Sequence, residues 1–143
     1  NGLSAALGIS QLKKLKKKIF RREKIYRRYL FNFKNYQNIK LLSYEKKSVT
    51  NYWMNILFFE NLNFKQINEM SLKLSKKKIE TRRLWRPINL QSHLKKFQKY
   101  KITNSLRFYE NCLCIPSDDS MSYSDIDKIS NYIKKFYEIV NNH

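Results

Sequence analysis

The chain has 143 residues, a length that fits one domain with one modest core. A hydrophobic content of 42% and an aromatic content of 15% exclude a disordered chain, and the presence of only two glycines excludes a glycine-rich phosphate-binding loop. The formal charge of +19 at pH 7 is compatible with binding to nucleic acid or an anionic surface, and also with basic residues that only solvate the surface.

A long amphipathic helix over roughly Leu3–Leu30 is the first predicted element. Its apolar residues recur at three-and-four spacing, with Arg22 in the one gap; they are Leu12, Leu15, Ile19, Tyr26, Tyr29 and Phe33. Ten cations within Lys13–Arg28, against Glu23 alone, surround the polar face. The polar segment Asn32–Lys40 breaks the helical pattern. The apolar stripe of this helix needs a partner surface.

Two strands, a second helix and a third strand follow. Ile39–Leu42 is predicted as the first strand, and Glu45–Asn51 as a connecting turn. The nearly continuous apolar run Tyr52–Phe59 (YWMNILFF) predicts a central strand that is buried on both faces. A second helix ends in the basic run Lys76–Lys78, and its apolar positions are Phe64, Ile67, Met70, Leu72 and Leu74. Ile79–Arg82 is a short third strand.

The segment after Pro87 is predicted to be irregular, with two short helical pieces. Leu90–Phe97 is a helical turn, and Ser105–Asn111 is a short helix. The strand Cys112–Ile115 follows and is closed by Pro116.

Neither cysteine is predicted to bind metal or to form a disulfide. Cys112 and Cys114 are one residue apart in a predicted strand, where the connecting loop is too short for a bridge. Their spacing differs from the C-x2-C of zinc sites, and His93 and His143 have no ligand-like spacing to them. We therefore expect two small core residues.

The last helix completes the predicted fold. It begins at a capping-box-like pair, Ser124 with Asp127, and its apolar face comprises Ile126, Ile129, Ile133, Phe136 and Val140. The order of elements predicts an α+β fold, a small antiparallel or mixed sheet packed by helices with a long N-terminal helix. We expect a single domain over residues 1–143, with the long helix at 3–30 and the sheet and remaining helices at 39–143.

The sequence carries no sign of a leader or a membrane span. No positively charged segment precedes an apolar stretch of signal-peptide length, and the longest apolar run, Ile56–Phe59, is far shorter than the ~20 residues that a membrane span needs. We expect a soluble, cytoplasmic protein. The residues from Asn1 onward have the composition of the middle of a helix, so we also expect a piece of a longer protein.

Three motifs carry a resemblance to one protein family. Ala5–Leu12 (AALGISQL) is similar to a family helix start of small apolar residues, A-A-[IL]-G, two residues and Gln-Leu. Ile79–Gln91 (IETRRLWRPINLQ) resembles I-E-T-R-P-L-W-K-x-M-H-x-Q, and Cys112–Ser117 (CLCIPS) resembles G-[IL]-C-L-P-S. Together these motifs resemble the C-terminal, small domain of DegT/StrS-type pyridoxal-phosphate-dependent nucleotide-sugar aminotransferases. The members that act on UDP-linked 4-keto-6-deoxy sugars are the most similar, and the resemblance spans essentially the whole chain.

The resemblance implies an enzyme that transfers an amino group from glutamate to a nucleotide-linked keto-sugar, for surface polysaccharide or glycan biosynthesis. The lysine that holds pyridoxal phosphate is expected upstream of Asn1, so no residue here is assigned as catalytic and the piece alone is expected to be inactive. A homodimer is also implied, with the long helix and its exposed Leu15, Ile19 and Tyr26 at the interface.

The segment Glu80–Trp85 is the part that the resemblance places against the substrate. The substrate-binding residues implied are Glu80, Thr81, Arg82, Trp85 and Asn89. Arg82 is expected to pair with the diphosphate and Trp85 to pack against a sugar or base face, with a surface ion pair and a core aromatic as the alternatives. Three positions depart from the family pattern: Arg83 replaces a proline, Arg86 a lysine and Asn89 a histidine.

Two other functions stay open from the sequence. The basic segment Lys13–Arg28 favours a protein that binds nucleic acid or an anionic surface. The charge excess and Asn89 are also compatible with an inactive remnant of the enzyme.

Overall fold

The computed structural model describes residues 1–45 and 48–141. Its helices are α1 (Gly2–Phe33), α2 (Phe64–Lys76), α3 (Asn104–Asn111) and α4 (Tyr123–Asn141), with two 3-10 turns, η1 (Ile88–Leu90) and η2 (Ser92–Leu94). Its strands are β1 (Ile39–Leu41), β2 (Asn55–Phe59), β3 (Arg82–Arg83) and β4 (Cys112–Ile115). The strands form one antiparallel sheet in the order β1-β2-β4-β3. The predicted α+β class is confirmed, and every strand pairing is antiparallel.

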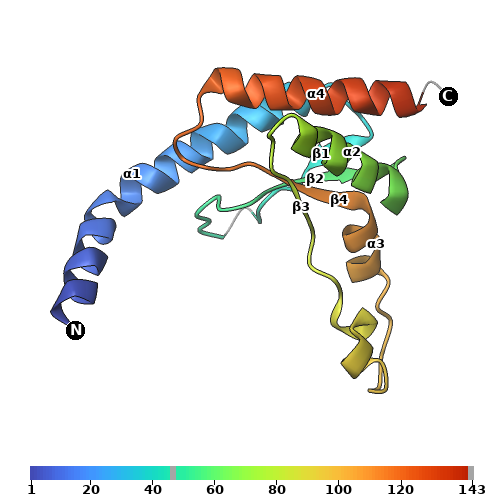
Figure 1. The fold of residues 1–143 in the computed structure, drawn as a ribbon, viewed down its shortest axis with the longest axis horizontal. Coiled ribbons are helices and arrows are strands. Elements are labelled where there is room, and N and C mark those ends of the chain that lie inside the picture. The colour runs from blue at the N-terminus through green and yellow to red at the C-terminus, as the bar shows by residue number, and fades with distance from the viewer. Residues whose placement is uncertain (46–47, 142–143) are drawn as a thin grey trace.

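One buried cluster holds the helices on the sheet. α1, α2 and α4 pack on one face of the sheet, and the N-terminal half of α1 projects away from this body (Figure 1). The largest fully buried apolar side chains include Tyr29, Leu57, Phe59, Ile67, Met70, Leu113, Ile126 and Ile133. Each such side chain contributes about 1.5–3 kcal/mol when it leaves water. The expected central strand is β2, which lies between β1 and β4 and is buried at four of its five positions.

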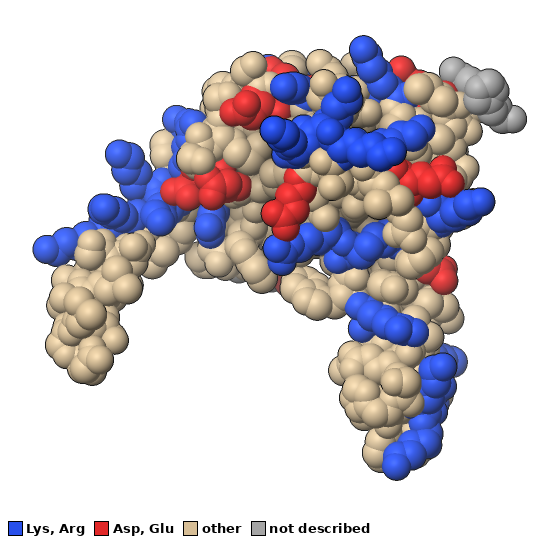
Figure 2. All heavy atoms as spheres, in the orientation of Figure 1, with Lys and Arg blue, Asp and Glu red and all other residues tan. Residues whose placement is uncertain are grey.

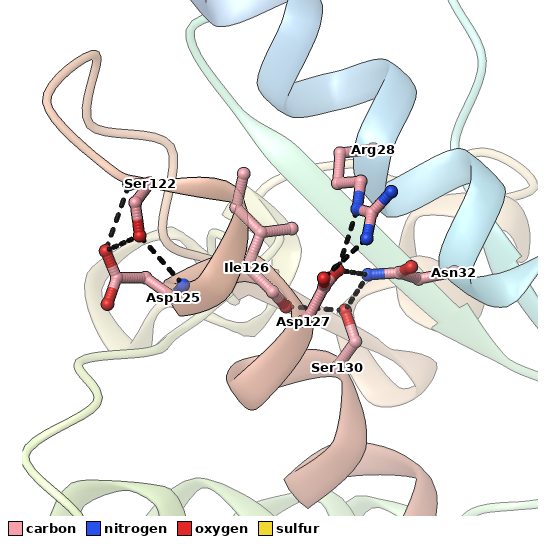
Figure 3. A network of polar contacts seen from close by, with 7 residues as sticks. All are labelled: Arg28, Asn32, Ser122, Asp125, Ile126, Asp127 and Ser130. Carbon is pink, nitrogen blue, oxygen red and sulfur yellow. Dashed lines mark hydrogen bonds and ion pairs between the residues drawn. The ribbon is translucent and has the colours of Figure 1, made fainter.

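A polar network joins α1 to α4 at the edge of this core (Figure 3). Arg28 donates from Nε and Nη2 to the two carboxylate oxygens of Asp127, at 2.8 and 2.5 Å. The Asn32 amide donates to Asp127 Oδ1 at 2.9 Å and to Ser130 Oγ at 3.0 Å, and Ser130 in turn donates to the Ile126 carbonyl oxygen. The bidentate geometry fixes the angle at which the two helices meet.

The Arg28–Asp127 pair makes the stability of the fold depend on pH. The hydrogen bonds from Arg28 and Asn32 lower the pKa of Asp127 in the folded protein. Stability from this carboxylate is therefore fully present above its unfolded pKa of about 4 and is lost as pH falls through the lower folded value. We expect Asp127→Asn to be less stable than the parent at neutral pH, and the gap to narrow at acidic pH. Urea unfolding at neutral and acidic pH measures this difference.

Asp119 provides the matched control for that measurement. It accepts from Arg21 through its backbone carbonyl oxygen, at 3.2 Å, so Asp119→Asn keeps the contact. The prediction would be contradicted if the free energies of unfolding of the parent and Asp127→Asn differed by the same amount at both pH values.

Three predicted elements match the structure closely, namely β4, α2 and α3. The predicted strand Cys112–Ile115 has the same bounds as β4, and the helix expected at Ser105–Asn111 begins one residue earlier. Both cysteines are free and buried in β4. Of the turn expected at Glu45–Asn51, residues 46 and 47 lie outside the described part of the chain.

The predicted end of the first helix was wrong, and of the three residues predicted to be exposed, Leu15 is exposed whereas Ile19 and Tyr26 are half-buried. α1 continues through Phe33, because Asn32 bonds to α4 and Phe33 is buried, although both begin the segment expected to break the pattern. Tyr26 is half-buried rather than exposed, since its ring packs against Tyr44 and Tyr52 at centroid distances of 5.4 Å. The core position in that turn of the helix is Ile25.

Three further boundaries were also wrong. Tyr52 has a positive φ of 50°, so the strand expected from Tyr52 begins at Asn55. The third strand is Arg82–Arg83 rather than Ile79–Arg82, and the turn expected over Leu90–Phe97 is divided into η1 and η2, which end at Leu94.

The capping box of α4 lies two residues before the predicted one. Ser122 Oγ accepts from the Asp125 N–H at 3.1 Å, and Asp125 Oδ2 accepts from the Ser122 N–H at 3.0 Å. This is the same Ser-x-x-Asp pattern as Ser124 with Asp127, which the sequence also contains. Asp127 instead bonds to α1. Among the described residues, no helix is both long and apolar enough to cross a bilayer.

Candidate functional site

The described structure contains an open groove of about 950 Å³. It lies between the loop before β2, the end of α2, the segment 79–85, the loop after β4 and the start of α4. Trp53, Glu80, Arg82, Trp85, Asp118 and Lys128 are among the side chains that line it. Three separate parts of the sequence, residues 53–54, 77–85 and 114–129, therefore meet at one surface.

The backbone conformation at the end of α2 directs the segment 79–85 along this groove. The N–H of Lys78 donates to the Ser75 carbonyl oxygen, and the N–H of Ile79 donates back to Leu74, at 2.8 and 3.0 Å. These two bonds are those of a Schellman motif, in which the residue after the cap adopts the left-handed conformation. Lys78 adopts this left-handed conformation, with φ of 59°. Ile79 is buried beside Leu74 in the core, so the following residues leave along the groove.

Lys78 occupies a backbone position that favours glycine, so its replacement by glycine is expected to stabilise the fold. A residue with a side chain loses about 1–2 kcal/mol of stability in the left-handed region, and glycine avoids this cost. Part of that gain is lost again, because glycine has more conformational freedom in the unfolded chain. Lys78→Gly should therefore raise the free energy of unfolding by up to about 1 kcal/mol. Lys77→Gly is the matched control, because Lys77 has φ of −93° and should lose stability. Urea unfolding of the two variants decides, and equal losses would contradict the assignment.

Glu80, Arg82 and Trp85, three of the five predicted site residues, lie together in the groove. Arg82 donates from Nε and Nη2 to Glu80 Oε1, at 3.0 and 2.7 Å. The side chains of Arg82 and Glu80 are 80% and 75% exposed, so solvent screens the pair strongly. Arg82 thus has paired donors that an incoming anion can take from Glu80.

Trp85 has a neighbour that the sequence analysis did not include in the site. The rings of Trp85 and Trp53 lie 6.3 Å apart at 46°, and they are 66% and 56% exposed. Trp85 is therefore not a core aromatic. Trp53 was expected inside a buried strand, but the strand begins two residues later and leaves its ring at the groove. Two accessible aromatic faces suit a planar base or a sugar ring.

The structure does not bring Thr81 and Asn89 into the groove. The hydroxyl oxygen of Thr81 lies 2.8 Å from that of Ser71 on α2. Asn89 lines a separate hollow of about 470 Å³, beside Phe97 and Ile102, where its Oδ1 is buried without a hydrogen-bond partner among the described residues. Their predicted contact with substrate stays a prediction without support from this arrangement.

Arg83, which replaces the family's proline, has a structural role. Its Nη2 donates to the carbonyl oxygens of Tyr109 and Glu110 at the end of α3, at 2.5 and 2.9 Å. Its guanidinium lies over the Phe64 ring at 4.5 Å, and burial lowers its pKa. The side chain therefore caps α3 and links it to α2 and β3.

The groove carries charges of both signs. Hydrogen bonds from Ser120 lower the pKa of Asp118, and hydrogen bonds from Ser122 lower the pKa of Asp125. Both carboxylates are ionised at neutral pH, and the groove is also lined by the basic residues Lys77, Lys78, Arg82, Arg83 and Lys128. The basic residues outnumber the three acidic ones that line the groove, so it favours anionic ligands.

The thiol at the groove is not a nucleophile at neutral pH. Cys114 lines the groove and is 9% exposed. Burial raises its pKa to about 11, and burial with the neighbouring thiol raises that of Cys112 to about 12. Both thiols stay protonated and serve as small core residues.

The family model for the DegT/DnrJ/EryC1/StrS aminotransferase family matches residues 1–134. The chain belongs to this family. Its similarity to solved structures agrees with this family assignment. The PLP form of Spr1654 from Streptococcus pneumoniae, assigned as a sugar aminotransferase, superposes with a TM-score of 0.84 at 25% identity, over 95% of this chain and 35% of that one.

Two further solved structures show the same fold. The aminotransferase TlmJ from Streptoalloteichus hindustanus has a TM-score of 0.83 at 18% identity, over 95% of this chain and 36% of TlmJ. PseC of Helicobacter pylori, an aminotransferase involved in the biosynthesis of pseudoaminic acid, has a TM-score of 0.83 at 21% identity, over 93% of this chain and 36% of PseC. This DegT-family chain thus spans about a third of the length of its relatives.

The described residues do not fit the cofactor lysine of a DegT-family aminotransferase. A lysine that forms a Schiff base is usually held in a desolvated pocket that lowers its pKa. Lys77, Lys78 and Lys128, the lysines that line the groove, are all exposed. The lysines that line the groove therefore lack the buried environment of a Schiff-base lysine.

Proposed function

We propose that this chain is the C-terminal part of a pyridoxal-phosphate-dependent aminotransferase that transfers an amino group from glutamate to a nucleotide-linked keto-sugar. The observation that carries the proposal is the groove, where Trp85 and the donors of Arg82, both on the segment that bears the family motif, lie beside Trp53 from the loop before β2. Its excess of cations suits a diphosphate.

Each groove residue has a distinct part in binding. The guanidinium of Arg82 exchanges Glu80 for the diphosphate and holds two phosphate oxygens with its paired N–H groups. Trp85, with Trp53, stacks on the base or the sugar. Both contacts orient the keto group and keep bulk water from that side of the sugar.

The rest of the protein supplies the cofactor. When bound there to a lysine, pyridoxal phosphate carries the amino group between the two substrates. We expect this chain to be inactive alone, and the full protein to be a cytoplasmic homodimer. The resemblance of Ile79–Gln91 favours a UDP-linked 4-keto-6-deoxy sugar as substrate and a product for surface polysaccharides or glycans.

The test is expression of the longest reading frame that contains this chain. The proposal requires the visible absorbance of a pyridoxal-phosphate Schiff base, bleached by glutamate, and glutamate-dependent amination of a UDP-4-keto-6-deoxy sugar. A folded protein that binds no cofactor would overturn it and would favour an inactive remnant.

A further inference from the structure

The outer face of α1 carries a continuous stripe of cations and phenylalanines. Residues at alternating steps of four and three lie on one face of a helix, and from Lys13 to Lys34 every such position is basic or phenylalanine. The stripe consists of Lys13, Lys17, Phe20, Lys24, Arg27, Phe31 and Lys34. All seven side chains are exposed, and in Figure 2 basic side chains gather along this helix. The core residues Ile25, Tyr29 and Phe33 face the opposite way.

The cations of the stripe differ in their contacts from the arginines on the inner side of α1. Arg21 donates to the carbonyl oxygens of Asp119 and Met121, and Arg28 donates to Asp127. Within the described residues, Arg27 is the one stripe cation engaged in an ion pair, with Glu23 at 2.7 Å. The inner arginines therefore stabilise the fold, whereas the side chains of the stripe are exposed to solvent.

Phe20 and Phe31 are apolar anchors within this basic surface. They are 57% and 55% exposed, and the 11-residue step from one to the other corresponds to about three turns, or roughly 16 Å along the helix. The ammonium of Lys24 lies 4.5 Å from the centre of the Phe20 ring, and that of Lys34 lies 4.5 Å from the centre of the Phe31 ring. Each ring thus stands beside a cation.

We propose that this stripe docks the protein on an anionic phospholipid bilayer. Phenyl rings flanked by lysines are the features with which a helix lies in the headgroup region, rings inward and cations on lipid phosphates. The stripe lies on the side of α1 opposite to its core residues, where it is open to contact with an extended surface. Single-stranded nucleic acid is usually held in a groove that tracks its backbone, and the stripe offers none.

Vesicle co-sedimentation of the full-length protein tests the proposal. The protein should sediment with phosphatidylcholine vesicles that contain phosphatidylglycerol, and not with phosphatidylcholine alone. Each cation near such a surface contributes about fivefold to the partition coefficient, so Lys13→Gln/Lys17→Gln/Lys24→Gln should lower it on the order of 100-fold. Phe20→Ala/Phe31→Ala should also lower it, with no change in charge. Circular dichroism and urea unfolding of these variants report whether they are folded.

A matched variant separates docking from general charge. Lys65→Gln/Lys76→Gln/Lys135→Gln removes three exposed lysines from α2 and α4 and should change the partition coefficient little. An equal loss in this control, or no sedimentation of the parent with anionic vesicles, would overturn the proposal. Tighter binding to RNA than to vesicles, unchanged in the phenylalanine variant, would overturn it in favour of nucleic acid. Because the readout is sedimentation, it is independent of the proposed enzymatic function.

Discussion

Truncation of Phe59 to alanine is expected to lower the free energy of unfolding by about 3–5 kcal/mol, the largest stability change that we predict for this chain. Phe59 is 0% exposed, pairs with Ile39 of β1 in the sheet, and stacks on Tyr137 of α4 with ring centres 6.4 Å apart. The sheet and the helix are both rigid, so the cavity is expected to stay largely open. Urea unfolding of the purified protein measures the change.

The control for this prediction is a phenylalanine outside the core. Phe20 is 57% exposed on α1, so Phe20→Ala should change the free energy of unfolding by less than about 0.5 kcal/mol. Similar losses in the two variants would show that the centre of the core does not lie at β2 and α4.

The fold class was predictable because apolar spacing records which face of each element is buried. The α4 positions expected to face the sheet include Ile126, Ile129 and Ile133, and all three are buried. The errors lie where a distant contact decides a boundary. Asn32 is polar and was expected to end α1, but its partners, Asp127 and Ser130, are almost a hundred residues away.

The site was predictable only in part, for a similar reason. Arg82 and Trp85, which line the groove, could be selected as candidates because the motif that contains them is contiguous in the sequence. Trp53 belongs to no motif, and only the chain geometry brings its ring beside Trp85. The positive φ of Tyr52 interrupts the extended backbone at the start of the apolar run. The sequence of the run gives no indication of this angle, so it does not show that the first residues of the run lie outside the strand.

Arg82→Ala is expected to lower kcat/KM for the nucleotide sugar by about 10- to 100-fold, because hydrogen bonds to a charged group contribute about 1.5–3 kcal/mol. The loss should appear mainly in KM, since the proposed contact of Arg82 is with the diphosphate and not with the reacting carbon. The reaction with glutamate alone, which contains no diphosphate, should proceed at the parental rate. Arg82→Lys should be intermediate, because it keeps the charge and loses the paired donors.

Two variants distinguish this role from a general effect of charge. Arg86→Ala removes an exposed arginine four residues further along the chain that does not line the groove, and should leave kcat/KM close to that of the parent. Glu80→Gln removes the competitor for the Arg82 guanidinium and should keep or raise the affinity for the nucleotide sugar. If Glu80→Gln and Arg82→Ala both weakened binding equally, the exposed ion pair itself, rather than a free guanidinium, would be the element that holds this wall of the groove in place.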